Sequence, residues 1–347
     1  MICILLHFFP KRLTLYPFEC IFHREGMLPL DMELVLVLAK QVLTMFTLMA
    51  VGVLFVKFQK MDLTGVKYIT NVLLYMVTPT LMIDSYQTAY DAIKFRGLML
   101  ALLLSFLSHG ISILLNSHIF LRKGTPGKVG VERFAAIYSN AGYIGIPLIQ
   151  ASFGAEGVFY ATAYLTAFNI LMWTHGVYIL KEGKKGCISV KSILLNPGVL
   201  GCIIGFLLFV SHITLPAPFG PAVHYAASMN TPLALFVSGV LLAKTDLRAA
   251  LGNLRLYLIS ALRIVVIPIL VLALMVVMRV NLWQENAGFI AVICLISTAC
   301  PTAQASGFFA TRCGADGEYG GQVMAVTTLA CIVTLPLIAG IGASVLM

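Results

Sequence analysis

The protein has 347 residues, of which 60% are hydrophobic and only 11% are charged. A soluble domain carries about 45–50% apolar and about 25% charged residues, so this composition excludes a soluble enzyme, a disordered protein and a nucleic-acid-binding domain. Apolar spans of about 20 residues could fill most of this length with short connections, which predicts one polytopic membrane protein. The formal net charge is +9, and its meaning depends on where the basic residues lie.

Residues 1–31 form an N-terminal tail that does not read as a signal peptide. Lys11 and Arg12 follow the apolar stretch MICILLHFF, whereas a signal peptide has its charges first. One hypothesis is that translation starts at Met27 or Met32 and that the preceding stretch is a gene-start artefact. The alternative is a genuine short external tail.

Ten apolar runs follow the tail, and each predicts a transmembrane helix because a lipid-exposed chain must satisfy its backbone hydrogen bonds internally. A transmembrane β-barrel would show short alternating strands, and this sequence pattern is absent. The predicted spans are 34–56, 67–84, 97–121, 133–153, 157–180, 193–211, 221–243, 254–278, 286–309 and 317–345.

The basic residues are distributed unevenly between the loops. Of 23 Lys and Arg, 15 lie in the odd-numbered loops, and the even-numbered loops hold only Lys94, Arg96 and Arg279. The positive-inside rule therefore makes the odd loops cytoplasmic, so both termini are expected outside a cell membrane (inner or plasma membrane). The charge of +9 is a topology signal, and no nucleic-acid partner is needed to explain it.

Two segments of the chain resemble each other. Pro147 begins P-L-I-Q-A-S in span 4, Pro301 begins P-T-A-Q-A-S in span 9, and each is followed by a small acidic turn, GAEG at 154–157 or GADG at 314–317. The spacing predicts two five-helix repeats, residues 32–181 and 192–347. Because five is odd, the copies must cross the membrane in opposite directions, which is the inverted-repeat architecture of secondary transporters.

Spans 4 and 9 also carry residues that interrupt helices. Gly142, Gly145 and Pro147 interrupt the first, and Pro301 interrupts the second, because proline removes a helical hydrogen bond and glycine unwinds at little cost. Unwound backbone inside a membrane is tolerated only where it is buried or lines a cavity. The half-helix N-termini there suit an anionic group. The alternative is a pair of ordinary proline kinks.

Three segments resemble the auxin efflux carrier family of bacterial and plant transporters: 132–154 (ERFAAIYSNAGYIGIPLIQASFG), 194–209 (LLNPGVLGCIIGFLLF) and 297–316 (STACPTAQASGFFATRCGAD). The resemblance covers about residue 32 to the end. It implies ten helices in two inverted repeats, related to bile-acid/sodium symporters, with a scaffold of spans 1, 2, 6 and 7 and a mobile transport part of spans 3–5 and 8–10. It also implies a dimer and a carboxylate-like solute bound where the broken helices cross, with Asn140 in contact. An auxin substrate does not carry over, because the residues around this Asn differ in plant members.

Further candidates for solute binding are polar side chains near the two breaks. Gln150 and Gln304 occupy equal repeat positions, and Arg263 is the deepest cation, which either holds an anion or clamps broken-helix carbonyls. The complete set of candidates is Asn140, Gly142, Gly145, Pro147, Gln150, Ser297, Thr298, Pro301, Gln304, Arg263, Asn71 and Asn230. Ser297 and Thr298 have an alternative role in bonding their own helix, and the two Asn residues have one in helix packing.

These features predict a secondary transporter, most simply an efflux carrier for a small organic anion. No Asp or Glu lies at the centre of a span, although proton-driven transporters usually carry one. A sodium- or proton-coupled uptake symporter of the same fold is the alternative, and a channel or solute sensor is a further one. An intramembrane enzyme would need a catalytic pair that the spans lack, and no cofactor motif or metal-ligand spacing is present.

Overall fold

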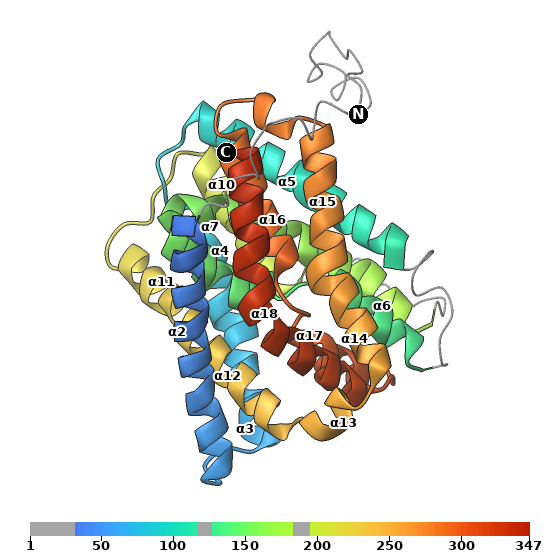
Figure 1. Ribbon diagram of the computed structural model, residues 1–347. Coiled ribbons are helices and arrows are strands. Elements are labelled where there is room, and N and C mark those ends of the chain that lie inside the picture. The colour runs from blue at the N-terminus through green and yellow to red at the C-terminus, as the bar shows by residue number, and fades with distance from the viewer. Residues whose placement is uncertain (1–31, 117–126, 183–194) are drawn as a thin grey trace.

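The computed structural model describes residues 32–116, 127–182 and 195–347, and the regular elements there are helices (Figure 1). The tail 1–31, the end of predicted span 3 and the start of predicted span 6 lie outside the described residues. Six helical stretches are long and apolar enough to cross a membrane: Leu34–Lys57, Leu63–Ser85, Ala92–Leu114, Phe219–Lys244, Leu254–Val277 and Gly317–Leu346. They coincide with six of the predicted spans.

The first half of the chain runs from α2 to α8. Its elements are α2 (Met32–Lys57), α3 (Leu63–Val72), η3 (Leu73–Val77), α4 (Thr78–Ser85), α5 (Ala92–Leu114), α6 (Val129–Ile137), η5 (Ala141–Gly145), α7 (Ile146–Leu171), η6 (Met172–Gly176) and α8 (Val177–Leu180). Helix α7 contains one non-helical residue, Gly154, with φ of 63°. This residue begins the acidic turn predicted between spans 4 and 5.

The second half follows a similar course. Its elements are α10 (Pro197–Val210), α11 (Phe219–Ser228), α12 (Asn230–Lys244), α13 (Leu247–Leu251), α14 (Leu254–Ala261), η7 (Leu262–Val266), α15 (Ile267–Val277), η8 (Val280–Leu282), α16 (Ala287–Ala299), α17 (Ala305–Arg312) and α18 (Gly317–Leu346). The second acidic turn also begins with a left-handed glycine, Gly314, with φ of 78°.

Three short π-helical turns stand immediately before a helix that has proline in its first turn. They are η3 before Pro79, η5 before Pro147 and η7 before Pro268. Proline has no N–H and its ring clashes with the carbonyl four residues earlier. A wider turn at these points lets the helical direction continue through the proline.

Several acidic residues that the sequence places in or beside the loops act as helix N-caps. Asp62, Asp91, Asp246 and Asp316 each accept a hydrogen bond from a backbone N–H in the first turn of the helix that follows. Such a cap satisfies one of the donors that a helix start leaves open. These caps explain why the acidic residues lie before the helices and not inside them.

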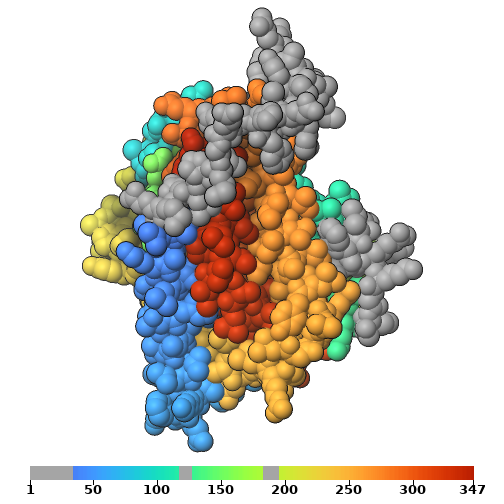
Figure 2. All heavy atoms as spheres, in the orientation of Figure 1, coloured from blue at the N-terminus to red at the C-terminus, as the bar shows by residue number. Residues whose placement is uncertain are grey.

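The helices pack as two groups. One group is α2, α3–α4, α10 and α11–α12, and the other is α5, α6–α7 and α14–α18. Helix α2 of the first group also packs on α18 and α7 of the second. On one face α2, α18 and α14–α15 lie side by side (Figure 2). The start of α2 and the C-terminus lie at the same end of the molecule (Figure 1).

Glycines bring the helices of the first group close together. A Cβ on Gly239 of α12 would meet the backbone carbonyl of Met49 of α2, and one on Gly52 of α2 would meet that of Phe236. Gly201 of α10 approaches the backbone of Pro79 in the same way. Small residues at helix crossings increase van der Waals contact, which is the main source of helix association in lipid.

We expect Gly239→Ala to lower the free energy of unfolding by about 1–3 kcal/mol, because a backbone carbonyl cannot move aside as a flexible side chain can. Thermal unfolding of the purified protein in detergent measures this. Gly110→Ala in α5 is the matched control, since a Cβ there meets nothing within 4 Å. Equal unfolding temperatures for the two variants would contradict the close packing of α2 on α12.

Candidate functional site

Two interrupted helices cross near the middle of the second helix group. Helix α6 ends at Ile137, α16 ends at Ala299, and the backbone beyond each is extended at Tyr138 and Cys300. Ser139 and Thr302 form an isolated antiparallel bridge. The N–H of Asn140 donates to the carbonyl of Pro301 at 2.7 Å, and the N–H of Ala303 donates to that of Tyr138 at 2.9 Å.

Arg263 binds the C-terminal ends of α6 and α16, the helices that precede the two breaks. Its side chain is fully buried, and its Nε donates to the carbonyl of Cys300 at 3.1 Å. One terminal nitrogen donates to the carbonyls of Ala136 and Ile137 at 3.3 and 3.2 Å, and the other donates to that of Thr298. Helix C-termini carry partial negative charge, so the guanidinium both bonds and neutralises two of them.

Two threonines complete the bonding of the crossing. The Thr302 hydroxyl donates to the carbonyl of Ala135 at 2.9 Å, and its N–H donates to the Thr327 hydroxyl of α18 at 3.1 Å. Both side chains are buried. Because backbone groups buried away from water must be paired, these bonds and those of Arg263 explain how extended backbone persists inside the apolar core.

The helices that follow the two breaks, η5–α7 and α17, begin beside α12. Asn230 donates to the carbonyl of Gly142 at 3.1 Å, and the Ser238 hydroxyl donates to the side-chain oxygen of Gln304 at 2.8 Å. The first N–H groups of such helix starts have no acceptor within their helix. Asn140 stands at one of these starts, is 4% exposed, and its Nδ2 has no hydrogen-bond partner among the described residues.

Aromatic rings border the crossing on the side of α5 and α7. The Tyr164 hydroxyl lies 3.2 Å from the Ser139 hydroxyl, and the ring of His109 lies 4.8 Å from that of Tyr164. The Nδ1 of His109 is 2.8 Å from the Ser105 carbonyl, so Nδ1 carries the proton in that bond.

The comparison with known protein families decides what kind of protein this is. The model of a family described as "Membrane transport protein" matches residues 37–189 and 186–339. This chain belongs to the auxin efflux carrier family of membrane transporters. A protein of Rhizobium meliloti (strain 1021) described as "Putative malonate transporter" is 25% identical over 227 residues, which are 62% of this chain and 68% of that protein. The chain is therefore a multi-pass membrane transporter and not an enzyme.

The structure of the transporter brings together only part of the predicted site. Asn140, Pro301, Gln304, Arg263 and Asn230 meet at the crossing through the bonds given above. Gly142 supplies a carbonyl to it, and a Cβ on Gly145 would lie 3.1 Å from the Cys300 sulfur. Pro147 is buried in the first turn of α7.

The side chains of four other candidates make no bond between the two breaks. Gln150 and Asn71 are exposed, on α7 and α3. The hydroxyls of Ser297 and Thr298 donate to carbonyls four residues earlier in α16, at 2.9 and 2.8 Å, which is the local bonding given above as their alternative. Their contact with a solute stays a prediction.

The structure corrects the register of the two breaks. The two P-x-x-Q-A-S segments suggest that Pro147 corresponds to Pro301, but Pro147 is helical and the first break lies earlier, at Tyr138–Asn140. Aligning the left-handed glycines of the two acidic turns, Gly154 and Gly314, brings Asn140 opposite Cys300 instead. The hexapeptide similarity is therefore local and does not mark equivalent positions.

Polar groups that the sequence analysis did not select support this part of the transporter. Glu132 is buried and accepts hydrogen bonds from Arg255, at 3.1 and 2.8 Å, and from the Tyr319 hydroxyl at 3.1 Å. This ion pair links α6, α14 and α18 at the end where these helices begin. The sequence signal was available, because an acid and a base each stand at the start of a predicted span.

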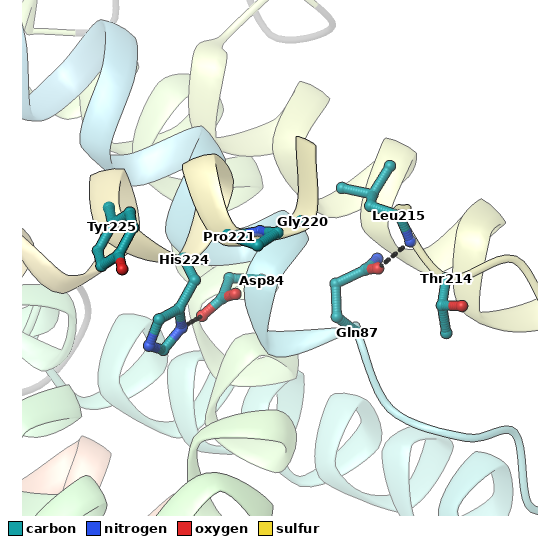
Figure 3. A pocket seen from close by; sticks show the side chains of 8 residues that line it. All are labelled: Asp84, Gln87, Thr214, Leu215, Gly220, Pro221, His224 and Tyr225. Atoms are coloured by element: carbon teal, nitrogen blue, oxygen red, sulfur yellow. Dashed lines mark hydrogen bonds and ion pairs between the residues drawn. The ribbon is translucent and has the colours of Figure 1, made fainter. Parts of the chain in front are cut away.

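A surface cavity of about 410 Å³ lies elsewhere, between the end of α4 and α11. Figure 3 shows the imidazole of His224 pointing at the carboxylate of Asp84, 3.0 Å away, and Gln87 pointing at the N–H of Leu215, 2.7 Å away. None of the predicted site residues is part of its lining.

We expect Thr302→Val to lower the free energy of unfolding by about 1–3 kcal/mol, because it leaves the buried carbonyl of Ala135 without its donor. Ser297→Ala is the control, since Ser297 is equally buried and its hydroxyl donates to a carbonyl of its own helix. Thermal unfolding of both variants measures the difference. If the control lost as much stability as Thr302→Val, the crossing would not depend on this hydroxyl.

Proposed function

We propose that this transporter carries a small organic anion, a mono- or dicarboxylate, by alternating access, with the solute bound at the crossing. The observation that carries the proposal is the pairing of two helix starts with the buried, unpartnered amide nitrogen of Asn140. Backbone N–H groups at helix starts favour negative charge, and an amide nitrogen is a donor that a carboxylate oxygen accepts from.

The proposed frame is ten membrane crossings in two inverted five-helix repeats, residues 32–181 and 192–347, with both termini outside the cell membrane. The similar acidic turns and the two breaks support it. Spans 1, 2, 6 and 7 would form the scaffold, and spans 3–5 and 8–10 would move against it, in agreement with the two packing groups of the helices. A homodimer of such units is part of the proposal.

Only two side-chain hydrogen bonds in the described structure were found to join the crossing to α12, which belongs to the proposed scaffold. They are Asn230 to the Gly142 carbonyl and Ser238 to Gln304. Movement of the transport part requires both to break, while the bonds of Arg263 and Thr302 stay within the moving part. The crossing can therefore travel as one unit that keeps its geometry.

The direction we propose is efflux. An anion that leaves a cell with a negative interior gains about 2.3 kcal/mol per charge per 100 mV, so no coupling ion is required. The transporter's similarity to a protein described as a malonate transporter makes malonate the first solute to test.

We expect malonate, or another small carboxylate, to raise the unfolding temperature of the purified protein, because a ligand that binds only the folded state stabilises it. Asn140→Ala should remove this shift while the protein without ligand unfolds at nearly its usual temperature. Asn169→Ala is the control, since its amide bonds only its own helix in α7. A full shift in Asn140→Ala would exclude this residue from solute binding.

We further expect efflux from preloaded proteoliposomes to accelerate when a potassium gradient with valinomycin makes the interior negative, because the solute carries negative charge outward. Imposed sodium or proton gradients should have no effect. Uptake that requires sodium or protons would favour the alternative, a coupled uptake symporter of the same fold. Flux that does not saturate and survives Asn140→Ala would favour a channel.

A further inference from the structure

Arg263 is a buried cation that no carboxylate of the described residues pairs with. The buried charged residues of the described ranges include Glu132, which is paired with Arg255. None of the ion pairs found between described residues includes Arg263, and its side chain donates to four backbone carbonyls. Guanidinium groups keep their proton in proteins, so the crossing holds one permanent positive charge.

The helix ends at the crossing show what this charge does. Each helix start carries about +0.5 and each helix end about −0.5 of an elementary charge. The ends of α6 and α16 and the starts of η5–α7 and α17 would sum to about zero if they stood alone. Arg263 sits on the two negative ends and cancels them, so a net charge of about +1 is left on the two starts beside α12.

We propose that Arg263 is the positioning residue that makes the crossing selective for anions, although its own donors are used by carbonyls and it does not touch the solute. The inference rests on the function proposed above and deepens it. The substrates it assigns are carboxylates, in preference to neutral molecules of the same shape. The solute meets the helix starts and Asn140. Arg263 acts on the solute from a distance, because it neutralises the negative ends of α6 and α16 and leaves the positive starts uncompensated.

Two substitutions separate the charge of Arg263 from its bonding. Arg263→Lys keeps the positive charge with fewer donors, and Arg263→Gln keeps donors without the charge. Arg255→Gln is the matched control, because it removes a cation whose charge Glu132 already neutralises.

The experiment measures the affinity of the purified protein for malonate and for its neutral diamide, malonamide. We expect the wild type, Arg255→Gln and Arg263→Lys to prefer malonate by about tenfold or more, and Arg263→Gln to lose most of that preference. A folded Arg263→Gln protein that retains the full preference would overturn the inference. Solute binding at Asn140 would then still stand, whereas a wild type that binds no carboxylate would remove the proposed function itself.

A measurement on the wild type keeps the inference testable if Arg263→Gln does not fold. Between about pH 7 and about pH 9 small carboxylates are fully ionised and arginine does not titrate. The preference for malonate should therefore stay constant over that range. A preference that falls as the pH rises would assign the charge to a titrating group instead of arginine and would overturn the role of Arg263.

Discussion

The bonds from one buried guanidinium to the carbonyls of two interrupted helices are the interaction on which the rest of this structure depends. Extended backbone in an apolar interior has no water to bond, so each peptide group there needs a partner within the protein. Arg263 supplies donors for Ala136, Ile137, Thr298 and Cys300. The short bridge between Ser139 and Thr302 supplies the remainder, and a crossing that would otherwise be costly becomes a fixed element.

The same interaction distinguishes the two sides of the crossing, the helix ends at Arg263 and the helix starts at α12. Arg263 bonds four carbonyls at the ends that face it, whereas the first N–H groups of the starts beside α12 have no acceptor within their own helix. A solute site of this kind needs no charged side chain in contact with the solute. In the proposed mechanism the crossing keeps its geometry during transport, because two single hydrogen bonds join it to α12 and several join it to Arg263 and α18.

The sequence predicted the parts of this arrangement that local chemistry determines. Hydropathy placed the six long apolar helices, because a span must be apolar over its length, and it left the acidic residues in or beside the loops, where four of them cap helices. Pro301 indicated the second break, since proline excludes a regular helix there. The depth of Arg263 in its span indicated a clamp as one of two roles.

Parts that tertiary contacts determine were predicted less well. The first break lies at Tyr138–Asn140, where no proline or glycine indicates it. It is stabilised by hydrogen bonds with Pro301 and Ala303 of the other segment, which the local sequence does not reveal. Gln150 and Gln304 looked equivalent in a six-residue comparison, yet one is exposed and the other bonds Ser238. Thr302, Thr327 and Tyr164 could be recognised only once the two breaks were seen together.

An experimental structure of the transporter with a bound carboxylate tests the account most directly. The account predicts density for the carboxylate within hydrogen-bond distance of the Asn140 amide nitrogen and the first N–H groups of η5 and α17, with Arg263 still bonded to the four carbonyls. Density for the solute in the cavity beside Asp84 and His224, with the crossing empty, would contradict it.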